Sequence, residues 1–242
     1  MGGRGLEILP VHGIPEVEPG DILAELIAVA VSGAGVDQPV LVNGDVVVIT
    51  QKVVSKAEGR VVDLDAGDPA ARRRLVEGEA VRVLRRRGEL LITETVHGFV
   101  CANAGIDLSN VAEGRAALLP TDPDRSARRI RDGLRAQLRV EVGVVVSDTF
   151  GRPWRRGATD VAIGCAGVAA VVDLRGRPDA RGRPLEVTEV AVADELASAA
   201  ELVMGKASGI PVAMVRGVDP SWLRESSVRA EVVRPPGEDL FR

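Results

Sequence analysis

Apolar residues along the chain fall into two patterns, which predict strands and helices respectively. The first is a short unbroken run rich in Val and Ile, which is typical of a strand covered on both faces. The second is a longer stretch with apolar positions at helical spacing. We predict strands at residues 6–11, 45–50, 89–93, 97–101, 142–147 and 211–215. We predict helices at residues 21–32, 68–87, 124–138 and 189–204, the last of them capped by Gly205.

The stretch from residue 68 to 87 is predicted to be helical through its whole length. Leu75, Val81 and Leu84 are its candidate core residues. Its two Arg triplets are expected to form a solvated face, because long cationic side chains commonly lie over apolar surface with their charge in water.

Length and composition suit a folded chain. With 242 residues and 45% hydrophobic content, the chain can bury a sizeable core as one large domain or as two modest subdomains. The final stretch, residues 218–242, is expected to be mostly irregular because Pro235, Pro236 and Gly237 interrupt it.

Composition argues against nucleic-acid and membrane partners. The net charge of −4 gives no overall attraction to phosphate backbones, and a chain without Tyr offers few rings for stacking on bases. No stretch approaches the roughly 20 apolar residues that cross a bilayer, and the first residues lack the apolar run of a secretory signal. We therefore expect a cytoplasmic protein in which Cys101 and Cys165 are core residues rather than a disulfide.

Asp148 is the sharpest candidate for chemistry, because it follows the apolar run 142–147. A carboxylate fixed at a strand end suits Mg²⁺ or Mn²⁺, which prefer oxygen ligands. Thr149 offers a hydroxyl, and Asp107 offers a second carboxylate from another turn. The alternative interpretation is that Asp148 and Asp107 only cap turns through their own side chains.

Polar and cationic residues accompany these carboxylates. Arg152, Arg155 and Arg156 are close enough in sequence to neutralise phosphate oxygens in the same pocket. Trp154, between them, either stacks on a ring or anchors the loop. The strand 45–50 also ends in polar residues, namely Gln51, Lys52, Ser55 and Lys56.

Familiar nucleotide-binding and phosphatase motifs are incomplete. Residues 204–208 resemble the end of a P-loop, but Ala200 stands where the first glycine of that motif is required. Residues 147–151 resemble the motif of the aspartyl-phosphate hydrolases, but Phe150 replaces its second aspartate. The sequence is therefore neither a Walker protein nor a phosphatase of that class.

Six linked segments are similar to one known family. They occur in order from about residue 6 to residue 217, so the similarity rests on several motifs rather than on one short pattern. The segments are Ile8–Pro15, Thr50–Lys56, Ala104–Val111, Ser147–Arg152, Glu189–Glu195 and Val203–Pro211. On these motifs the chain resembles the coenzyme F420-0:L-glutamate ligase family, also called gamma-glutamyl ligases.

The resemblance implies a GTP-dependent ligase that attaches L-glutamate to coenzyme F420-0 and can extend a γ-linked glutamate tail. It implies Mn²⁺ or Mg²⁺, together with K⁺, as ions. In this chemistry the carboxylate of the precursor attacks the γ-phosphate of GTP, which gives an acyl phosphate and GDP. The glutamate amine then displaces phosphate, and cations offset the charge on the oxygens involved.

The resemblance also implies a fold and an assembly. It predicts a gamma-glutamyl-ligase-like α+β fold, with a single ligase domain over residues 1–242 made of two intertwined subdomains and largely antiparallel, mixed sheets. It further implies a homodimer. Some relatives continue into a flavin-binding, nitroreductase-like domain after a segment like 236–241, and we expect no such domain in this chain.

Matched position by position, the resemblance assigns residue roles. Asp107 and Asp148, the expected catalytic residues, would bind a first metal ion, and Thr149 would bind a second. The implied nucleotide contacts are Ile14, Pro15, Glu16, Val17, Gln51, Lys56, Asn110, Met204, Gly205, Lys206, Ala207, Ser208, Gly209, Ile210 and Pro211.

The chain departs from the family pattern at two of these positions. Lys206 stands where archaeal relatives present Gln to the second metal, and an ammonium has no lone pair with which to bind a cation. Gln51 stands where some relatives have Ser. Two alternatives therefore stay open: a catalytically idle nucleotide-binding or scaffold relative, and an amide ligase acting on another carboxylate. Loss of GTP that depends on glutamate distinguishes a ligase from an idle binder.

Overall fold

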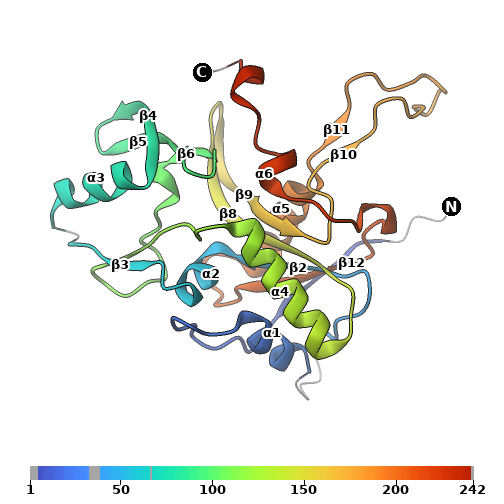
Figure 1. The fold of residues 1–242 in the computed structure, drawn as a ribbon, viewed down its shortest axis with the longest axis horizontal. Coiled ribbons are helices and arrows are strands. Elements are labelled where there is room, and N and C mark those ends of the chain that lie inside the picture. The colour runs from blue at the N-terminus through green and yellow to red at the C-terminus, as the bar shows by residue number, and fades with distance from the viewer. Residues whose placement is uncertain (1–4, 33–38, 66, 241–242) are drawn as a thin grey trace.

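A computed structural model describes residues 5–32, 39–65 and 67–240, and it has the mixed α+β architecture that was predicted (Figure 1). Its largest sheet has the strand order β1-β12-β2-β8-β9. Strands β2 and β8 run parallel, and the other neighbouring strands of this sheet run antiparallel. These strands are β1 (Glu7–Val11), β2 (Val46–Thr50), β8 (Gly143–Arg152), β9 (Arg155–Ala166) and β12 (Val212–Arg216).

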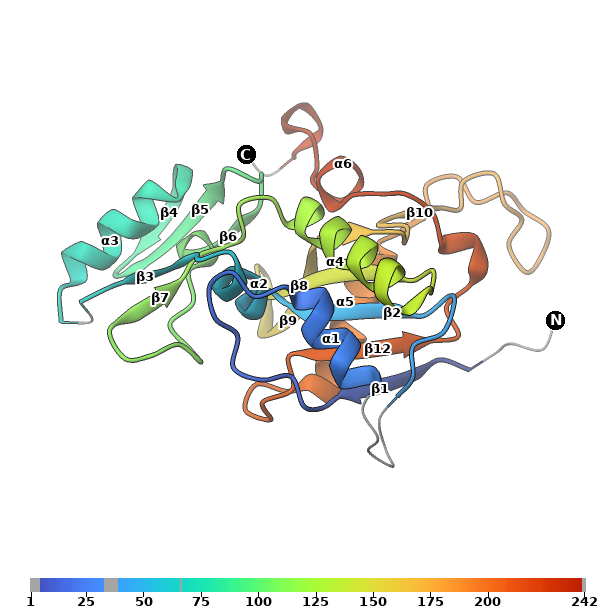
Figure 2. The same ribbon diagram turned by 60° about the horizontal axis from the view of Figure 1, so that its bottom comes forward.

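Helices cover both faces of this sheet, which explains why its central strands are apolar without interruption (Figures 1 and 2). In β2, Val47 and Ile49 belong to a core cluster with helices α1 and α4. The alternate residues Val46 and Val48 belong to a second cluster with helices α5 and α6. The four helices are α1 (Leu23–Ser32), α4 (Pro123–Leu138), α5 (Val192–Met204) and α6 (Val228–Glu231).

A smaller group of elements lies beside the main sheet and includes two of the shorter sheets (Figure 2, left). Its strands pair as β3-β7 and β4-β5-β6, and these pairings are antiparallel. The largely antiparallel character of the sheets is therefore confirmed. The elements are β3 (Val61–Asp63), α3 (Pro69–Gly78), β4 (Ala80–Arg87), β5 (Leu90–Thr95), β6 (Val100–Ala102), a short 3₁₀ helix (Asn103–Gly105) and β7 (Arg115–Ala117).

The single helix predicted for residues 68–87 was wrong. Helix α3 ends at Gly78, and the rest of the segment forms strand β4, which pairs with β5. Val81 is exposed rather than part of the core, whereas Val76 is buried. β-branched residues favour a strand, and cross-strand hydrogen bonds with β5 decided the conformation.

Two elements next to the candidate chemistry also differ from the prediction. Strand β8 does not end at Ser147 but continues to Arg152, so Asp148 lies inside a strand. Helix α2 (Gln51–Ala57) follows β2 without a loop. The hairpin partner β9 explains the first difference, because its backbone pairs with β8 beyond the apolar run.

The remaining elements are short. Strands β10 (Val172–Asp173) and β11 (Glu189–Val190) pair with each other, so α5 begins later than predicted. After β12 the described chain contains α6 and two 3₁₀ helices, Pro220–Trp222 and Pro236–Glu238. No helix in the described part of the chain is long and apolar enough to cross a membrane.

Both cysteines are buried and unbonded to each other, as predicted. Burial raises the pKa of the Cys101 thiol to about 12, and the nearby charge of Asp148 adds to this effect. Burial likewise raises the pKa of Cys165 to about 12. Both side chains are therefore neutral core residues at physiological pH.

The first turn of α4 lies directly on strand β9. A Cβ atom placed on Gly164 would lie 2.3 Å from the carbonyl carbon of Pro123, so only glycine fits there. One carboxylate oxygen of Asp124 accepts hydrogen bonds from the backbone N–H groups of Cys165 and Val228, both at 2.8 Å. These hydrogen bonds join α4 and α6 to β9, the strand that pairs with the Asp148-bearing strand β8.

Candidate active site

Three parts of the chain meet at one edge of the main sheet. The carboxyl end of β2 lies there beside the middle of β8, because Thr50 pairs with Ser147. The backbone N–H of Thr50 also donates to the carbonyl of Pro211 at 2.9 Å, which places the loop after α5 at the same edge. A cavity of about 330 Å³ opens among them.

This cavity gathers most of the residues predicted to bind nucleotide. Its lining includes Ile14, Pro15, Glu16, Val17, Gln51, Lys56, Asn110, Gly205, Lys206, Ala207, Gly209, Ile210 and Pro211. It also includes the predicted metal residues Asp148 and Thr149. A second cavity, of about 380 Å³, shares Glu16, Val17, Lys56 and Asn110 with the first, so there is room for more than one ligand.

Three predicted residues lie outside the lining. Met204 is fully buried in the core, and Ser208 donates to its backbone carbonyl. Asp107 is the third, and it contacts the lining through Lys52. The ammonium of Lys52 lies 2.8 Å from the Asp107 carboxylate, and Lys52 itself lines the cavity.

The arginines predicted to help in phosphate binding do not line the cavity. Because β8 and β9 continue as a long hairpin, Arg152, Arg155 and Arg156 lie near its exposed end. Trp154, at the hairpin turn, is 82% exposed, which rules out a buried anchor. The expectation that these arginines lie in the same pocket as Asp148 was therefore wrong, whereas stacking of Trp154 on a ring stays a prediction.

Lysines supply the positive charge instead. The chain has 31 Lys and Arg residues, and its three lysines are Lys52, Lys56 and Lys206. All three line the cavity, and none of the arginines in the described ranges does. A lysine is a compact point charge on a flexible stem, whereas an arginine presents a planar fork. The distribution therefore marks this cavity as the place where compact positive charge is needed.

Asp148 and Thr149 point to opposite sides of β8, because successive residues of a strand alternate. The charge of Asp107 lies close enough to Asp148 to affect its ionisation. Burial raises the pKa of the Asp148 carboxyl to about 7, although the N–H of Thr149 opposes this, and repulsion from Asp107 and Asp160 raises it further. Burial also acts to raise the pKa of Asp107, but the Lys52 ion pair and Ser109 lower it overall.

Thr149 faces a second cluster, which the sequence interpretation missed. Its hydroxyl donates to Asp160 at 2.6 Å, since the hairpin register places these residues opposite each other. Lys206 donates to the same Asp160 oxygen at 2.9 Å and forms an ion pair with Glu201 at 3.0 Å. Burial acts to lower the pKa of Lys206, but its bonds to Asp160 and Glu201 raise the pKa overall.

Two buried acceptor atoms of lining residues have no hydrogen-bond partner within the described part of the chain. The amide nitrogen of Gln51 donates to Ser55 and to the Leu118 carbonyl, at 2.6 and 2.8 Å, which fixes the orientation of the amide. Its buried Oε1 is left unpaired, and so is Oε2 of Glu201. A buried unpaired acceptor is costly, so an additional N–H or O–H donor at either atom would be favourable.

The Asp148 side of the cavity fits a divalent cation that is completed by a ligand. Among residues 5–32, 39–65 and 67–240, no three His, Cys, Asp or Glu side chains form a preformed metal cluster. Mg²⁺, however, commonly binds one or two carboxylates together with substrate phosphates. Asp148 and Asp107 supply two carboxylates whose mutual repulsion a cation would relieve.

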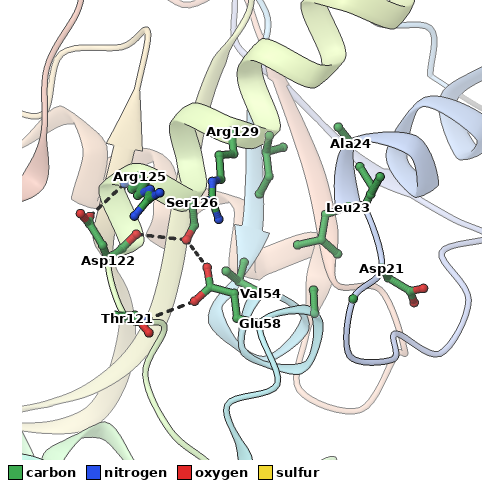
Figure 3. A pocket seen from close by; sticks show the side chains of 14 residues that line it. Asp21, Leu23, Ala24, Val54, Glu58, Thr121, Asp122, Arg125, Ser126 and Arg129 are labelled. Atoms are coloured by element: carbon green, nitrogen blue, oxygen red, sulfur yellow. Dashed lines mark hydrogen bonds between the residues drawn. The ribbon is translucent and has the colours of Figure 1, made fainter.

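A larger cavity, of about 560 Å³, is lined by residues of α1, α2 and α4 and of the segments that precede α1 and α4 (Figure 3). Its carboxylates are already used by local donors. Glu58 accepts from the N–H of Thr121 and from the hydroxyl of Ser126, and Asp122 caps the N–H of Arg125. None of the predicted site residues lines it. The smaller cavity is therefore the candidate active site.

Comparison with known proteins decides the family. Residues 13–217 match the sequence model of the F420-0:gamma-glutamyl ligase family, which is most of the chain. The chain belongs to the F420-0:gamma-glutamyl ligase family. This range contains every residue that lines the candidate cavity.

Full-length relatives in this ligase family agree. The chain is 44% identical over 253 residues to the coenzyme F420:L-glutamate ligase of Methanothermobacter thermautotrophicus, covering 98% of this chain and 99% of the relative. It is 45% identical over 260 residues to the protein of the same name from Methanopyrus kandleri, with both chains fully covered. A third, from Methanocaldococcus jannaschii, is 40% identical over 98% of this chain and 95% of its own length.

The sequence carried a signal for the residues that were missed. Asp160 is the one charged residue in the strand segment from Ala158 to Ala166, which is otherwise small or apolar. Charged residues are almost never fully buried unless they are paired, so its position predicts a functional or structural partner. The three lysines of an arginine-rich chain were a second signal.

Proposed function

We propose that this protein is a GTP-dependent ligase that joins L-glutamate to coenzyme F420-0. The names of its full-length relatives, all coenzyme F420:L-glutamate ligases, support the reaction. The observation that carries the proposal for this chain is the convergence of Asp148, the three lysines and most of the loop at 205–211 in one cavity, with Asp107 ion-paired to the lining residue Lys52.

In the proposed first step, a carboxylate of F420-0 attacks the γ-phosphorus of GTP. The bond to the β,γ-bridging oxygen breaks, so GDP leaves and an acyl phosphate forms. Lys52, Lys56 and Lys206 lie where they can offset charge on the phosphate oxygens. A Mg²⁺ or Mn²⁺ ion held through Asp148 and Asp107 would polarise those oxygens.

In the second step, the neutral amine of glutamate attacks the acyl carbon and inorganic phosphate leaves. The unpaired acceptors Gln51 Oε1 and Glu201 Oε2 can orient groups that carry N–H or O–H donors, such as an amine or a ribose hydroxyl. The adjoining cavity leaves space for a growing γ-linked glutamate tail. K⁺ and a homodimer complete the proposal, as the family resemblance implies.

Mass spectrometry tests the proposed reaction directly. Purified protein is incubated with F420-0, L-glutamate, GTP, Mn²⁺ and K⁺, with GTP omitted from a parallel sample. Glutamyl additions that require GTP are the expected result. Folded protein that binds GTP but forms no product would contradict the proposal. It would favour an idle binder, or a ligase for another carboxylate if a different acceptor consumed GTP.

Replacing Lys56 by Ala is expected to weaken GTP binding about tenfold, because it removes a charge-assisted hydrogen bond worth about 1.4 kcal/mol. The Lys56 side chain is largely buried and lies at the junction of the two cavities. Isothermal titration calorimetry with GTP measures the effect. Arg74→Ala is the matched control, because it removes an exposed cation from α3. Equal GTP affinity for wild type and Lys56→Ala would remove Lys56 from the nucleotide site.

A further inference from the structure

The ammonium of Lys206 lies in a cage of three oxygen atoms from three different elements. Its Nζ is 2.9 Å from Oδ1 of Asp160 on β9 and 3.0 Å from Oε1 of Glu201 on α5. It also donates to the hydroxyl of Thr149 on β8. We call these three atoms the oxygen cage.

The oxygen cage matches the shape of an ammonium group. An ammonium has three N–H donors, and the cage presents three acceptors. A planar guanidinium spreads its donors over a larger fork and does not suit a single central position. The chain uses arginine for most of its cations, so lysine at this position agrees with a requirement for compact charge.

The atoms of the cage are already committed to Lys206 and to one another. The Thr149 hydroxyl gives its proton to Asp160, and its acceptor side faces Lys206. Ser147 donates to the other oxygen of Asp160 at 3.2 Å, and the Asp160 side chain is only 2% exposed. A divalent ion bound through Thr149 would have to displace the Lys206 ammonium from these bonds. The described residues therefore do not fit a metal ion at Thr149.

We propose that Lys206 is a built-in cation that takes the place of a second metal ion, so that each chain binds one divalent ion, on the Asp148 side of β8. The alternation of β8 separates the two positions, because Asp148 and Thr149 point to opposite faces. Lys206 then acts as a positioning residue that holds Thr149 and Asp160 and keeps positive charge beside the phosphates. The inference rests on the proposed function for the divalent ion and the nucleotide.

Counting bound ions tests this inference without turnover. Mn²⁺ is titrated into the protein in the presence of GDP, and free Mn²⁺ is measured by electron paramagnetic resonance. Wild type is expected to bind one Mn²⁺ per chain. Lys206→Gln removes the ammonium from the oxygen cage and is expected to bind two. The double variant Lys206→Gln with Thr149→Val is expected to return to one, because the cage loses its hydroxyl.

Two results would overturn the inference: two ions in wild type, or the same number of ions in wild type and Lys206→Gln. Circular dichroism tests whether Lys206→Gln is folded. If it is unfolded, the number of Mn²⁺ ions bound per wild-type chain alone decides whether the inference holds. If the proposed function is wrong, mass spectrometry shows no GTP-dependent product. The difference in ion number between variant and wild type is measured independently of that product.

Discussion

Replacing Asp148 by Asn is expected to lower ligation more than about 100-fold while leaving the fold intact. The change removes one negative charge at nearly constant volume from the carboxylate pair proposed to hold the divalent ion. Even residues that only support metal ligands are worth about 10- to 100-fold in affinity or activity, so a direct ligand should exceed that range. The rate of glutamyl addition, measured by mass spectrometry at saturating GTP, is the appropriate test.

The thermal stability of Asp148→Asn, unlike its activity, should not fall. Burial and repulsion from Asp107 and Asp160 disfavour the charged Asp148 carboxylate in the protein alone, so a neutral amide should not lower the melting temperature. Asp132→Asn is the matched control, because Asp132 is an exposed aspartate on α4. Turnover of Asp148→Asn close to that of wild type would exclude Asp148 as a metal ligand.

Replacing Gly164 by Ala is expected to destabilise the protein by about 3 kcal/mol or more. The new methyl group would overlap the backbone of Pro123 and Asp124, and backbone cannot move away as a flexible side chain can. The first turn of α4 would have to separate from β9, which would weaken the hydrogen bonds of Asp124 to Cys165 and Val228. Urea denaturation measures the change in the free energy of unfolding.

The same hairpin offers a control for that experiment. Gly151 lies in β8, and a Cβ atom added there meets nothing within 4 Å. Gly151→Ala is therefore expected to change stability by less than about 0.5 kcal/mol. A comparable loss in both variants would mean that glycine is needed for backbone freedom in this hairpin, and that the contact with α4 contributes little.

The sequence was most informative where both faces of an element are buried. The runs at 45–50 and 142–147 predicted β2 and β8 because a strand covered by helices must be apolar throughout. The position of Asp148 directly after such an apolar run was also visible in the sequence. The sequence did not predict that β8 continues past Asp148. This extension depends on pairing with β9, and a local pattern of residues does not identify a pairing partner.

Non-local contacts account for the other differences. The second half of segment 68–87 became β4 because β5 was available as a partner. Asp160 was missed because its neighbours are apolar and its hydrogen-bond partners come from β8 and from the loop after α5. Asp148 and Asp107 were chosen from their positions after an apolar run and in a turn, and the family resemblance assigned both to one metal ion. Their electrostatic coupling became visible only with the fold.

Because all three lysines lie in one cavity, amine-specific chemical labelling can report on that cavity. Reagents that acylate primary amines react with lysine side chains and with the chain's α-amino group, but not with the arginines that cover the rest of the molecule. Such a reagent would therefore modify this cavity almost selectively. Peptide mapping of Lys52, Lys56 and Lys206, with and without a candidate ligand, would report protection residue by residue and reveal occupancy even for ligands that are not turned over.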